Sequence, residues 1–552
     1  MKKIFALSVA IIFSVNVFSQ APVWLWEKTV GGAGMDESWD IASDGNGSAY
    51  IAGFFSSSSI TFGTITLNNA GGVNVFIAKY NSFGNVLWAR SAGGSGGDDA
   101  YGIATDVNGN VYVTGKFSSP SITFGSITLN NISDYDFFIA KYDSAGNALW
   151  AKVAGGNSDD RGYGLAADAN GNVFVTGIFT SSSITFGVTT LTNPAGYSDL
   201  FIVKYDSAGN VLWAKKAGGN KFDFALRDAT DGNGNVYVTG WFDSDSISFG
   251  TTTLVNAHGG NHDFFIVKYD SAGNVLWAKR AGTTSDDAGL DVATDASGNA
   301  FVSGYFGPSS VSFGPITLNN TGSSDGFLVK YDTGGNVAWA KAMGGLDYDI
   351  NTGVSIDAAG NAFVSGSFFS SVIIFGTDSL LNTSTSFNDV FVAKYNSAGN
   401  LLWKTKVGGS ADEYSPRVAY DQFGNVYVTG YFYSPVISFG TDDLYNMGFD
   451  DIFLAKLEGG AVTAMENIAY DKEITISPNP ATNEIKIQSA EFKVESVEIY
   501  DVMGEKLPCA PLSSRRGAGG EVIDVSSLAS GIYFLRIFSA SGIVTKKFVK
   551  TN

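Results

Sequence analysis

The chain has 552 residues, and its 53 acidic residues outnumber its 34 basic residues, which gives a formal charge of −19 at pH 7. Proteins that hold a phosphate backbone need clustered lysine and arginine, so this balance excludes nucleic acid as the partner. The single cysteine, Cys509, excludes an internal disulfide and a cysteine-rich zinc site, and we expect it to be an inert thiol.

The first residues have the pattern of an export signal. Two lysines precede an apolar run over residues 4–18, and Val17 and Ser19 are of the kind that a signal peptidase accepts. We expect cleavage near Ser19 or Gln20, which removes residues 1–19 as a signal peptide. Because no other stretch approaches the roughly 20 apolar residues of a membrane span, the sequence predicts an exported protein without one.

A long internal repeat follows the signal. The segment KYDSAGNVLWAK stands at residues 204–215 and again at 268–279, and such identity at a fixed interval indicates one structural unit copied along the chain. The period is 62 to 64 residues, far from the roughly 34 of helical repeats. It is set by seven tryptophans: Trp26, Trp88, Trp150, Trp213, Trp277, Trp339 and Trp403.

Each unit predicts four short strands, which we call A to D. In the copy that begins at residue 225, ALRDATD and NVYVTGWF are rich in β-branched and aromatic residues, as are DFFIVKYD and NVLWAKRAG. Both pairs are joined by the pattern D-x-x-G-N, in which the aspartate can bond back to turn amides and the glycine supplies a positive φ. Apolar residues on both faces of these strands favour small sheets packed face to face.

Four-stranded units with this spacing predict an all-β fold, a seven-bladed β-propeller over residues 21–457. The repeat array begins with a D strand at residues 26–30, and its last unit, 417–457, stops after its C strand. Each end thus supplies the strand that the other lacks, which supports closure of the ring. Pairing of these two segments would leave no long open edge. An open solenoid is the alternative, and it leaves the missing strand unexplained.

The motifs of the repeated unit resemble those of a known repeat family. The pattern D-x-x-G-N-V-Y-V-T-G, then I-T-F-G, then D-x-F-I-A-K-Y-D resembles the bacterial beta-propeller repeat family SBBP over about residues 22–457. The first copy departs from it, with DGNGSAYIAG and with Asn74 where the other copies have aspartate. The resemblance implies a propeller outside the cytoplasm and implies no reaction.

The repeat motifs end before a linker at residues 458–472, and a different sequence pattern follows it. Alternating runs such as EIKIQ and VEIYD predict a small Ig-like β-sandwich over 473–552. ISPNPATNEIKI, VEIYDVMGEKL, IDVSSLASGIYFLRI and KKFVK resemble the C-terminal sorting domain of the type IX secretion system of Bacteroidetes, whereas the loop CAPLSSRRGAGG departs from it. An ordinary structural module is the alternative. The resemblance implies a sorting signal carried by Pro478, Asn479, Pro480, Gly504, Gly531, Tyr533, Lys546 and Lys547, and the secretion machinery as partner.

The search for catalytic motifs is mostly negative. GGSGG at residues 93–97 fits the nucleophile motif G-x-S-x-G but aligns with D-to-A connections in other copies. The D-x-N-G-N turns lack the glutamate of a calcium loop, so they are better explained as hairpin turns. His258 and His262, with Asp263, are weak metal candidates whose alternative is a solvated loop. No catalytic residue and no cofactor is expected.

One set of residues suggests a site. An acidic residue stands four positions after each Gly-Gly equivalent, where the chain enters strand A near the central axis. Seven carboxylates at one channel mouth would raise each other's pKa unless a cation, such as calcium, or a basic ligand offset the repulsion. The alternative is that each caps its own turn. The candidate ligand or cation ring is Asp36, Asp98, Asp160, Asp223, Asp287, Asp349 and Glu413.

The topology of the unit also separates two faces. The near-identical A-to-B and C-to-D turns share one face, and the opposite face carries the acidic ring and seven B-to-C excursions with tips that differ between copies. We therefore predict a secreted or surface-attached, non-catalytic binding or adhesion module for an extracellular glycan or protein. A propeller enzyme acting on glycans and a structural surface-layer protein are the alternatives.

Overall fold

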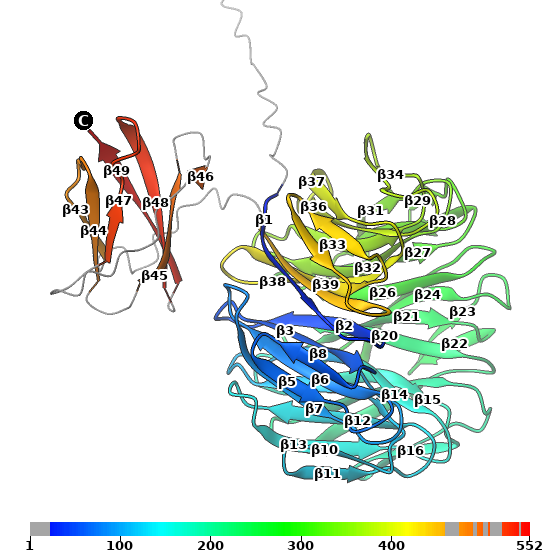
Figure 1. Ribbon diagram of the computed structural model, residues 1–552. Helices are drawn as coiled ribbons and strands as arrows, with labels where there is room; N and C mark the ends of the chain where they lie inside the picture. Colours follow the sequence, from blue (N-terminus) through cyan, green and yellow to red (C-terminus); the bar gives the residue numbers. More distant parts are fainter. Residues whose placement is uncertain are drawn as a thin grey trace, which may run out of the picture. The chain divides into compact units, whose positions relative to one another are not determined.

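The computed structural model describes residues 22–458, 474–489, 494–500, 506–507, 521–539 and 542–551. The chain divides between residues 460 and 461 into two compact units, and all regular elements in the described ranges are β-strands (Figure 1). The expected signal peptide, nearly all of the expected linker, Cys509 and Gly504 lie outside these residues.

The first unit is a propeller of seven four-stranded antiparallel sheets. Neighbouring innermost strands contact one another all the way around, β38 against β2 included, so the sheets form a closed ring. The innermost strands are β2 (Asp36–Ser43), β8 (Asp98–Thr105), β14 (Asp160–Ala167), β20 (Asp223–Thr230), β26 (Asp287–Thr294), β32 (Asp349–Ile356) and β38 (Glu413–Tyr420). The second strands are β3 (Ala49–Phe55), β9 (Val111–Phe117), β15 (Val173–Phe179), β21 (Val236–Phe242), β27 (Ala300–Phe306), β33 (Ala362–Phe368) and β39 (Asn425–Phe432).

The outer half of each blade follows the same order. The third strands are β6 (Asn74–Tyr80), β12 (Asp136–Tyr142), β18 (Asp199–Tyr205), β24 (Asp263–Tyr269), β30 (Asp325–Tyr331), β36 (Asp389–Tyr395) and β42 (Asp451–Glu458). The outer strands are β7 (Val86–Ala92), β13 (Ala148–Ala154), β19 (Val211–Ala217), β25 (Val275–Ala281), β31 (Val337–Met343), β37 (Leu401–Val407) and, in the last blade, β1 (Trp24–Val30). The four-stranded propeller blade predicted from the repeat is thus confirmed.

The D-x-x-G-N sequence builds its hairpin turn through the aspartate. Oδ1 of Asp270 accepts hydrogen bonds from the backbone N–H of Ala272 at 2.9 Å and of Asn274 at 2.8 Å. Gly273 has φ +82°, a conformation that costs a residue with a Cβ far more than it costs glycine. The aspartate and the glycine therefore fix the turn together, which explains why the pattern recurs at both hairpins of a blade.

Each excursion between the second and third strands contains a two-stranded hairpin that the sequence analysis treated as loop. Its residues alternate: Ile60, Phe62 and Leu67 are buried in the blade core, whereas Thr61 and Thr66 are exposed and share a hydrogen bond of 3.0 Å. The strands have only four residues each, but the segment SITFGTITLN already shows the alternation of apolar and polar residues that is typical of a β-strand. The hairpins are β4 (Ser59–Phe62) with β5 (Ile65–Asn68), β10 (Ser121–Phe124) with β11 (Ile127–Asn130), β16 (Ser183–Phe186) with β17 (Thr189–Thr192), β22 (Ser246–Phe249) with β23 (Thr252–Val255), β28 (Ser310–Phe313) with β29 (Ile316–Asn319), β34 (Val372–Phe375) with β35 (Asp378–Leu381) and β40 (Val436–Phe439) with β41 (Asp442–Tyr445).

Neighbouring blades are joined through the repeated turn YDSAGN. Nε1 of Trp88 in one blade donates to the carbonyl of Ser144 in the next at 3.0 Å, and Nζ of Lys79 reaches the same carbonyl at 3.4 Å. A Cβ on Gly146 would lie 2.7 Å from the Trp88 ring, so this turn needs glycine for space as well as for its φ of +80°. The twelve-residue segment recurs because each copy both receives the preceding tryptophan and supplies the next one.

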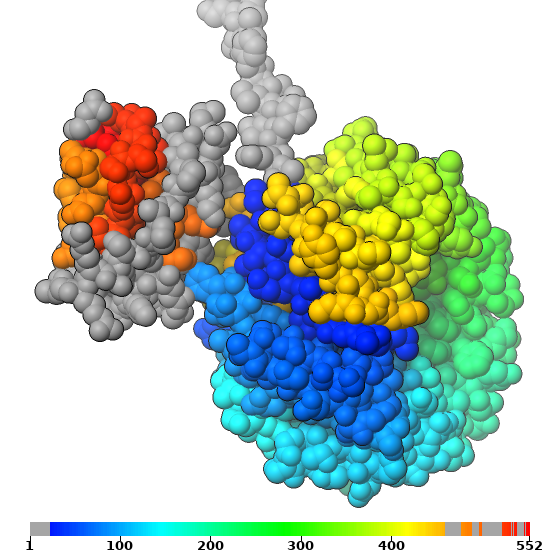
Figure 2. Space-filling model, in the orientation of Figure 1, coloured from blue at the N-terminus to red at the C-terminus, as the bar shows by residue number. Residues whose placement is uncertain are grey.

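The ring closes by pairing the two ends of the propeller. Strand β1 runs antiparallel to β42, with Trp26 opposite Lys456 and Val30 opposite Ile452. In Figure 1 the dark blue β1 lies among the yellow strands of the last blade, and Figure 2 shows the same seam on the surface. Because this blade has no turn between its third and outer strands, Nε1 of Trp403 in the preceding blade is buried without a hydrogen-bond partner.

The second unit contains two small sheets. One has the order β43-β44-β47 and the other β46-β45-β48-β49, and Ile487, Leu535 and Phe548 belong to a common buried cluster. The bounds are β43 (Ile474–Ser477), β44 (Glu484–Ser489), β45 (Val494–Tyr500), β46 (Lys506–Leu507), β47 (Glu521–Asp524), β48 (Gly531–Ser539) and β49 (Gly542–Lys550).

Candidate functional site

The seven acidic residues of the predicted ring are buried in their own blades. Each is the first residue of an innermost strand and is 0 or 1 % exposed. Oδ2 of Asp98 accepts a hydrogen bond from Oγ of Ser119 at 2.6 Å and from the N–H of Gly94 at 2.9 Å. Four other members bond a serine 21 residues further on in the same way: Asp36, Asp160, Asp223 and Asp349. This is the geometry of a turn cap, the second of the two interpretations.

Burial raises the pKa of every member of the ring. The pKa reaches about 7 at Asp160, Asp223, Asp287 and Asp349, where serine, threonine and backbone donors oppose the effect of burial. At Glu413 burial raises the pKa to about 8. At neutral pH the ring therefore carries much less than seven negative charges. In the described part of the chain, no three His, Cys, Asp or Glu side chains are grouped so that they could hold a metal ion.

These pKa values predict that the stability of the protein falls as the pH rises from 5 to 8. The unfolded carboxyls release their protons near pH 4, whereas the folded ones keep them to about pH 7 or 8, so the folded state binds more protons across this window. Each extra proton bound costs about 1.4 kcal/mol of unfolding free energy per pH unit. Calorimetry from pH 5 to 8 should show a falling Tm, and changing Asp98, Asp223 and Asp349 to Asn should flatten the curve.

The same measurement tests a cation site. If calcium occupies the ring, a hundredfold excess over its dissociation constant should stabilise the parent by about 2.7 kcal/mol at pH 8, and the Asn variant should lose this increment. A chelator should then lower the Tm of the parent alone. Turn capping instead predicts that calcium leaves both melting curves unchanged, and a Tm that stays level from pH 5 to 8 would contradict the role of the buried carboxyls.

The glycines before the ring acids, which are paired in six of the seven blades, have a packing role. A Cβ on Gly93 would lie 2.1 Å from Oδ1 of Asn74, and one on Gly94 would lie 2.8 Å from Oγ of Ser119. The first glycine thus makes room for the third strand of its own blade and the second for the cap of the next acid. GGSGG at residues 93–97 lies between β7 and β8, where no helix follows.

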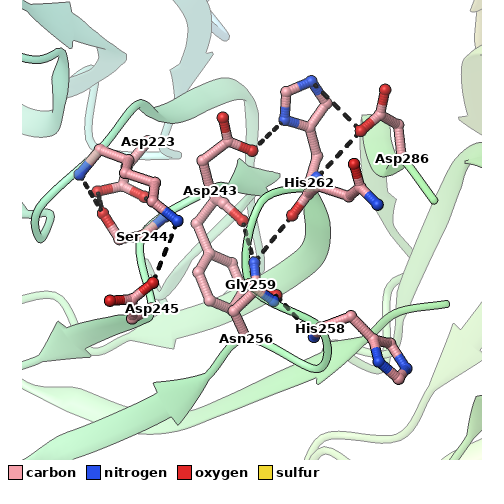
Figure 3. A network of polar contacts seen from close by, with 12 residues as sticks. Asp223, Asp243, Ser244, Asp245, Asn256, His258, Gly259, His262 and Asp286 are labelled. Atoms are coloured by element: carbon pink, nitrogen blue, oxygen red, sulfur yellow. Dashed lines mark hydrogen bonds and ion pairs between the residues drawn. The ribbon is translucent and has the colours of Figure 1, made fainter. Parts of the chain in front are cut away.

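The structure does not bring the three metal candidates together. His262 Nδ1 lies 2.5 Å from Oδ1 of Asp243, and its ring packs 3.9 Å from the Trp241 ring, whereas the side chain of His258 points away from it (Figure 3). Asp263 is buried and accepts hydrogen bonds from a backbone amide and an arginine. His262 is therefore part of the polar surface of one loop tip.

A lysine of the third strand forms an ion pair with the aspartate of the A-to-B turn in six blades. Oδ2 of Asp44 lies 3.5 Å from Nζ of Lys79, and both side chains are buried. Similar ion pairs join Lys141 to Asp106, Lys204 to Asp168, Lys268 to Asp231, Lys330 to Asp295 and Lys394 to Asp357. The lysine of the repeated AKY thus balances the turn aspartate, which supports the interpretation of these segments as hairpin turns.

The variable tips rest on a constant asparagine that the sequence analysis did not single out. Nδ2 of Asn131 donates to the carbonyl of Phe117 at 2.8 Å and to that of Asp134 in its tip at 3.0 Å. An asparagine bonds the last carbonyl of the second strand in all seven blades: Asn69, Asn131, Asn193, Asn256, Asn320, Asn382 and Asn446. Each tip then packs beside the next blade's connection, as the bridge between Val73 and Gly97 shows. One scaffold therefore presents seven different tips.

Exposed apolar side chains gather on the face with the tips, which we call the varied face. Nine large apolar residues that are more than a third exposed lie in its tips and connections: Met35, Ile132, Tyr197, Phe222, Leu346, Tyr348, Phe387, Met447 and Phe449. Among the other described large apolar residues with this exposure, Val107 lies in a D-x-x-G-N turn of the opposite face. The rest lie on or beside the outer strands or in the two-stranded hairpins between the second and third strands, which we call rim hairpins. A concentration of exposed apolar residues on one face indicates an interaction surface.

An arc of aromatic rings lies beside the innermost strands on the same side. In six innermost strands a β-bulge contains the fourth residue, and such bulges re-aim the side chain they contain; in β2, β8 and β14 that residue is aromatic, namely Trp39, Tyr101 and Tyr163. Successive rings of the arc have centroids 4.3 to 6.3 Å apart. The aromatic arc is Tyr431, Trp39, Tyr101, Tyr163, Phe224 and Trp241. Strand β20 has Leu226 at its bulge and joins the arc through Phe224, its second residue; β26 and β32 carry Leu290 and Thr352 at the bulge, and the arc does not extend to their blades.

The predicted sorting residues are spread over both sheets of the second unit. Oδ1 of Asn479, between Pro478 and Pro480, accepts a hydrogen bond from the N–H of Val549 at 2.9 Å, which ties the turn after β43 to β49. Tyr533, in the strand that Gly531 begins, stacks on Phe548 with centroids 5.5 Å apart. Lys546 and Lys547 lie in β49.

Comparison with known proteins matches two parts of the chain. Residues 475–551 match the model of the secretion system C-terminal sorting domain, and residues 87–116 match the SBBP beta-propeller repeat. The chain thus carries an SBBP repeat and a type IX sorting domain. Both resemblances seen in the sequence are confirmed, and the sorting domain indicates secretion to the outer surface or the extracellular space.

More distant similarities extend over the propeller. The uncharacterized WD repeat-containing protein L264 of Acanthamoeba polyphaga mimivirus is 25% identical over 502 residues, covering 71% of this chain and 36% of that protein. The regulatory protein FlaEY of Caulobacter vibrioides is 25% identical over 364 residues, covering 61% of this chain and 36% of that protein. The chain thus spans about a third of the length of these relatives.

Among solved structures, a protein of unknown function from Dyadobacter fermentans aligns with a TM-score of 0.34 at 10% identity, over 80% of this chain and 98% of that one. A calcium-binding regucalcin from Agrobacterium tumefaciens aligns with a TM-score of 0.28 at 10% identity, over 63% of this chain and 85% of that one.

In the described residues of our chain, no helix has the length and apolar character needed to cross a bilayer.

Proposed function

We propose that this chain is a secreted or surface-attached binding module, without catalysis, that holds an extracellular ligand on its varied face. The observation that carries the proposal is the coincidence of seven different tips, nine exposed apolar residues and the aromatic arc on one face. A fold that needed only stability would gain nothing from exposing the nine apolar residues there, because exposed apolar surface lowers solubility.

A glycan is the ligand that this face suits best. The apolar C–H faces of sugar rings pack on aromatic side chains, and the rings of the arc are held by their neighbours, so little conformational entropy is lost on binding. Carboxylates beside the rings can accept hydrogen bonds from sugar hydroxyls: Oδ2 of Asp99 accepts one from the Tyr101 hydroxyl at 3.1 Å. A matrix protein is the alternative ligand, bound by the same exposed anchors.

The proposal predicts that removing exposed aromatics from the D-to-A connections of the varied face weakens binding and that removing an equally exposed residue on an outer strand does not. A screen of the chain against glycans and matrix proteins identifies a ligand, and Phe222→Ala with Tyr348→Ala, which are 43% and 66% exposed, should then bind it about tenfold more weakly. Leu212→Ala, 52% exposed on outer strand β19, is the matched control.

Equal loss in the varied-face variant and the Leu212→Ala control, or no ligand among either glycans or matrix proteins, would count against a binding face. The same screen addresses the enzymatic alternative, since release of product from a bound glycan would show catalysis instead of binding.

A further inference from the structure

A cavity of about 230 Å³ lies at the centre of the ring. All seven innermost strands contribute lining residues, which places it on the propeller axis. Ser43 and Tyr420, the last residues of β2 and β38, line it as well, so it lies toward the D-x-x-G-N turns and away from the varied face. Its ligand would therefore be distinct from the one proposed for the varied face.

The residues at this cavity break the sevenfold repeat. The fifth residue of the innermost strand is glycine in three blades and charged in four: Asp40, Gly102, Gly164, Arg227, Asp291, Gly353 and Arg417. The next position is isoleucine, leucine or valine in six blades but Asp228 in β20. Glycine at three positions shows that the propeller closes around its axis without a side chain there, so the repeat itself does not require these charges.

Part of the charged set satisfies the open inner edges of the strands. Oδ2 of Asp40 accepts a hydrogen bond from the N–H of Ile103 in the next blade at 2.9 Å, and Oδ2 of Asp291 accepts one from Val354 at the same distance. Arg227 donates to the carbonyls of Tyr163 at 2.8 Å and Tyr101 at 3.1 Å, so its guanidinium reaches two other blades. Arg417 donates to Leu290 and lies 3.7 Å from Asp291.

Three polar atoms of these residues are left without partners. Nε of Arg227, Nε of Arg417 and Oδ2 of Asp228 are buried and make no hydrogen bond in the described structure. Arg227 and Asp228 are each only 7 % exposed. Unpaired buried donors and acceptors are costly, and such atoms in a cavity indicate a ligand that would pair with them.

The charges around the cavity alternate and nearly cancel. Burial raises the pKa of Asp228 well above its usual range. At the fifth strand position two aspartates, Asp40 and Asp291, alternate with two arginines, Arg227 and Arg417, in the order Asp, Arg, Asp, Arg around the ring. A balanced site has no net charge to attract a simple anion or cation, whereas it favours a molecule that carries one charge of each sign.

We propose that the axial cavity binds a free α-amino acid, with its carboxylate toward the arginines and its ammonium toward the aspartates. The volume supports this class, because a cavity below the roughly 300–1,000 Å³ of drug-sized pockets admits only a small metabolite. The N–H at Nε of Arg227 and at Nε of Arg417 is left to donate to a carboxylate, and the aspartates provide acceptors for an ammonium group. Ile41, Ile103 and Val418 supply an apolar wall for the amino-acid side chain.

The first test changes the ligand and leaves the protein intact. Calorimetric titration of the full chain with the common amino acids, glucose, galactose and inorganic phosphate should give saturable binding at one site for one or more amino acids only. The N-acetyl form, which lacks the ammonium, and the amide, which lacks the carboxylate, should each bind at least about tenfold more weakly. Absence of binding by all amino acids, binding of a sugar or phosphate in their place, or equal binding of either derivative would overturn the proposal.

The second test changes the cavity. Arg227→Gly introduces the residue that three blades already carry, and Arg417→Met removes the other guanidinium. Both should weaken the amino acid at least about tenfold. Arg280→Met is the matched control, since this guanidinium pairs with Asp263 and does not line the cavity. Unchanged affinity in folded cavity variants would contradict the site, and if these variants fail to fold, the ligand derivatives alone decide.

Discussion

Deleting residues 474–552 is expected to leave nearly all of the chain in the periplasm. The N-terminal pattern serves export across the inner membrane, whereas the segment that matches the sorting domain is the part of the chain that indicates passage through the outer membrane. The propeller and this segment are separate compact units, so the shortened chain should keep its fold. Fractionation and immunoblotting of cells and medium measure the outcome.

Two controls separate sorting from folding. The periplasmic propeller should melt at the temperature of the propeller in the full chain, which excludes misfolding as the cause of retention. The same segment fused behind a signal-bearing reporter should carry the reporter out of the cell. Normal amounts of the shortened chain in the medium or on the surface would show that these residues are not needed for sorting.

The blade was predictable because its determinants are local. Asp270 and Gly273 fix their turn within five residues, so the sequence alone places both strands that flank it. The rim hairpin was equally local, yet four-residue strands such as β4 give only two inward side chains, Ile60 and Phe62, and so a weak periodic signal.

The candidate sites were less predictable because they depend on contacts between distant residues. Asp98 is buried because Ser119, 21 residues further on, supplies its hydrogen bond, and the sequence does not show how deep that pair lies. The channel mouth expected to hold seven charges is thus a ring of capped and partly protonated carboxyls. Trp88 and Ser144 likewise meet only when two blades stack.

The charged residues that line the axial cavity can be found in the sequence only by comparing the copies of the repeat with one another. Aligning the seven innermost strands puts Arg227 and Arg417 where other copies have glycine, and that contrast is the signal. The residues that all seven copies share make this contrast easy to overlook. Function in a repeat protein is better sought where one position differs among the copies, because the shared residues hold the scaffold.

Removal of residues 21–30 is expected to destabilise the propeller and expose an adhesive edge. Strand β1 covers the outer edge of β42, and its loss uncovers the backbone groups of β42 together with the apolar contacts of Val30 and Trp26. Full burial of one large apolar side chain stabilises by about 1.5–3 kcal/mol, so the Tm should fall by several degrees. An unpaired edge also templates association, and the shortened chain should form oligomers.

The control for this experiment keeps the strand and removes one inter-blade contact. Trp26→Ala loses the hydrogen bond to the carbonyl of Ser82 but retains the pairing with β42, so it should lower the Tm without causing association. A synthetic peptide of residues 21–30 added to the shortened chain should occupy the vacant edge, restore part of the Tm and dissolve the oligomers. Light scattering and calorimetry measure both effects, and a shortened chain that stays monomeric and melts like the parent would show that the ring does not depend on this strand for closure.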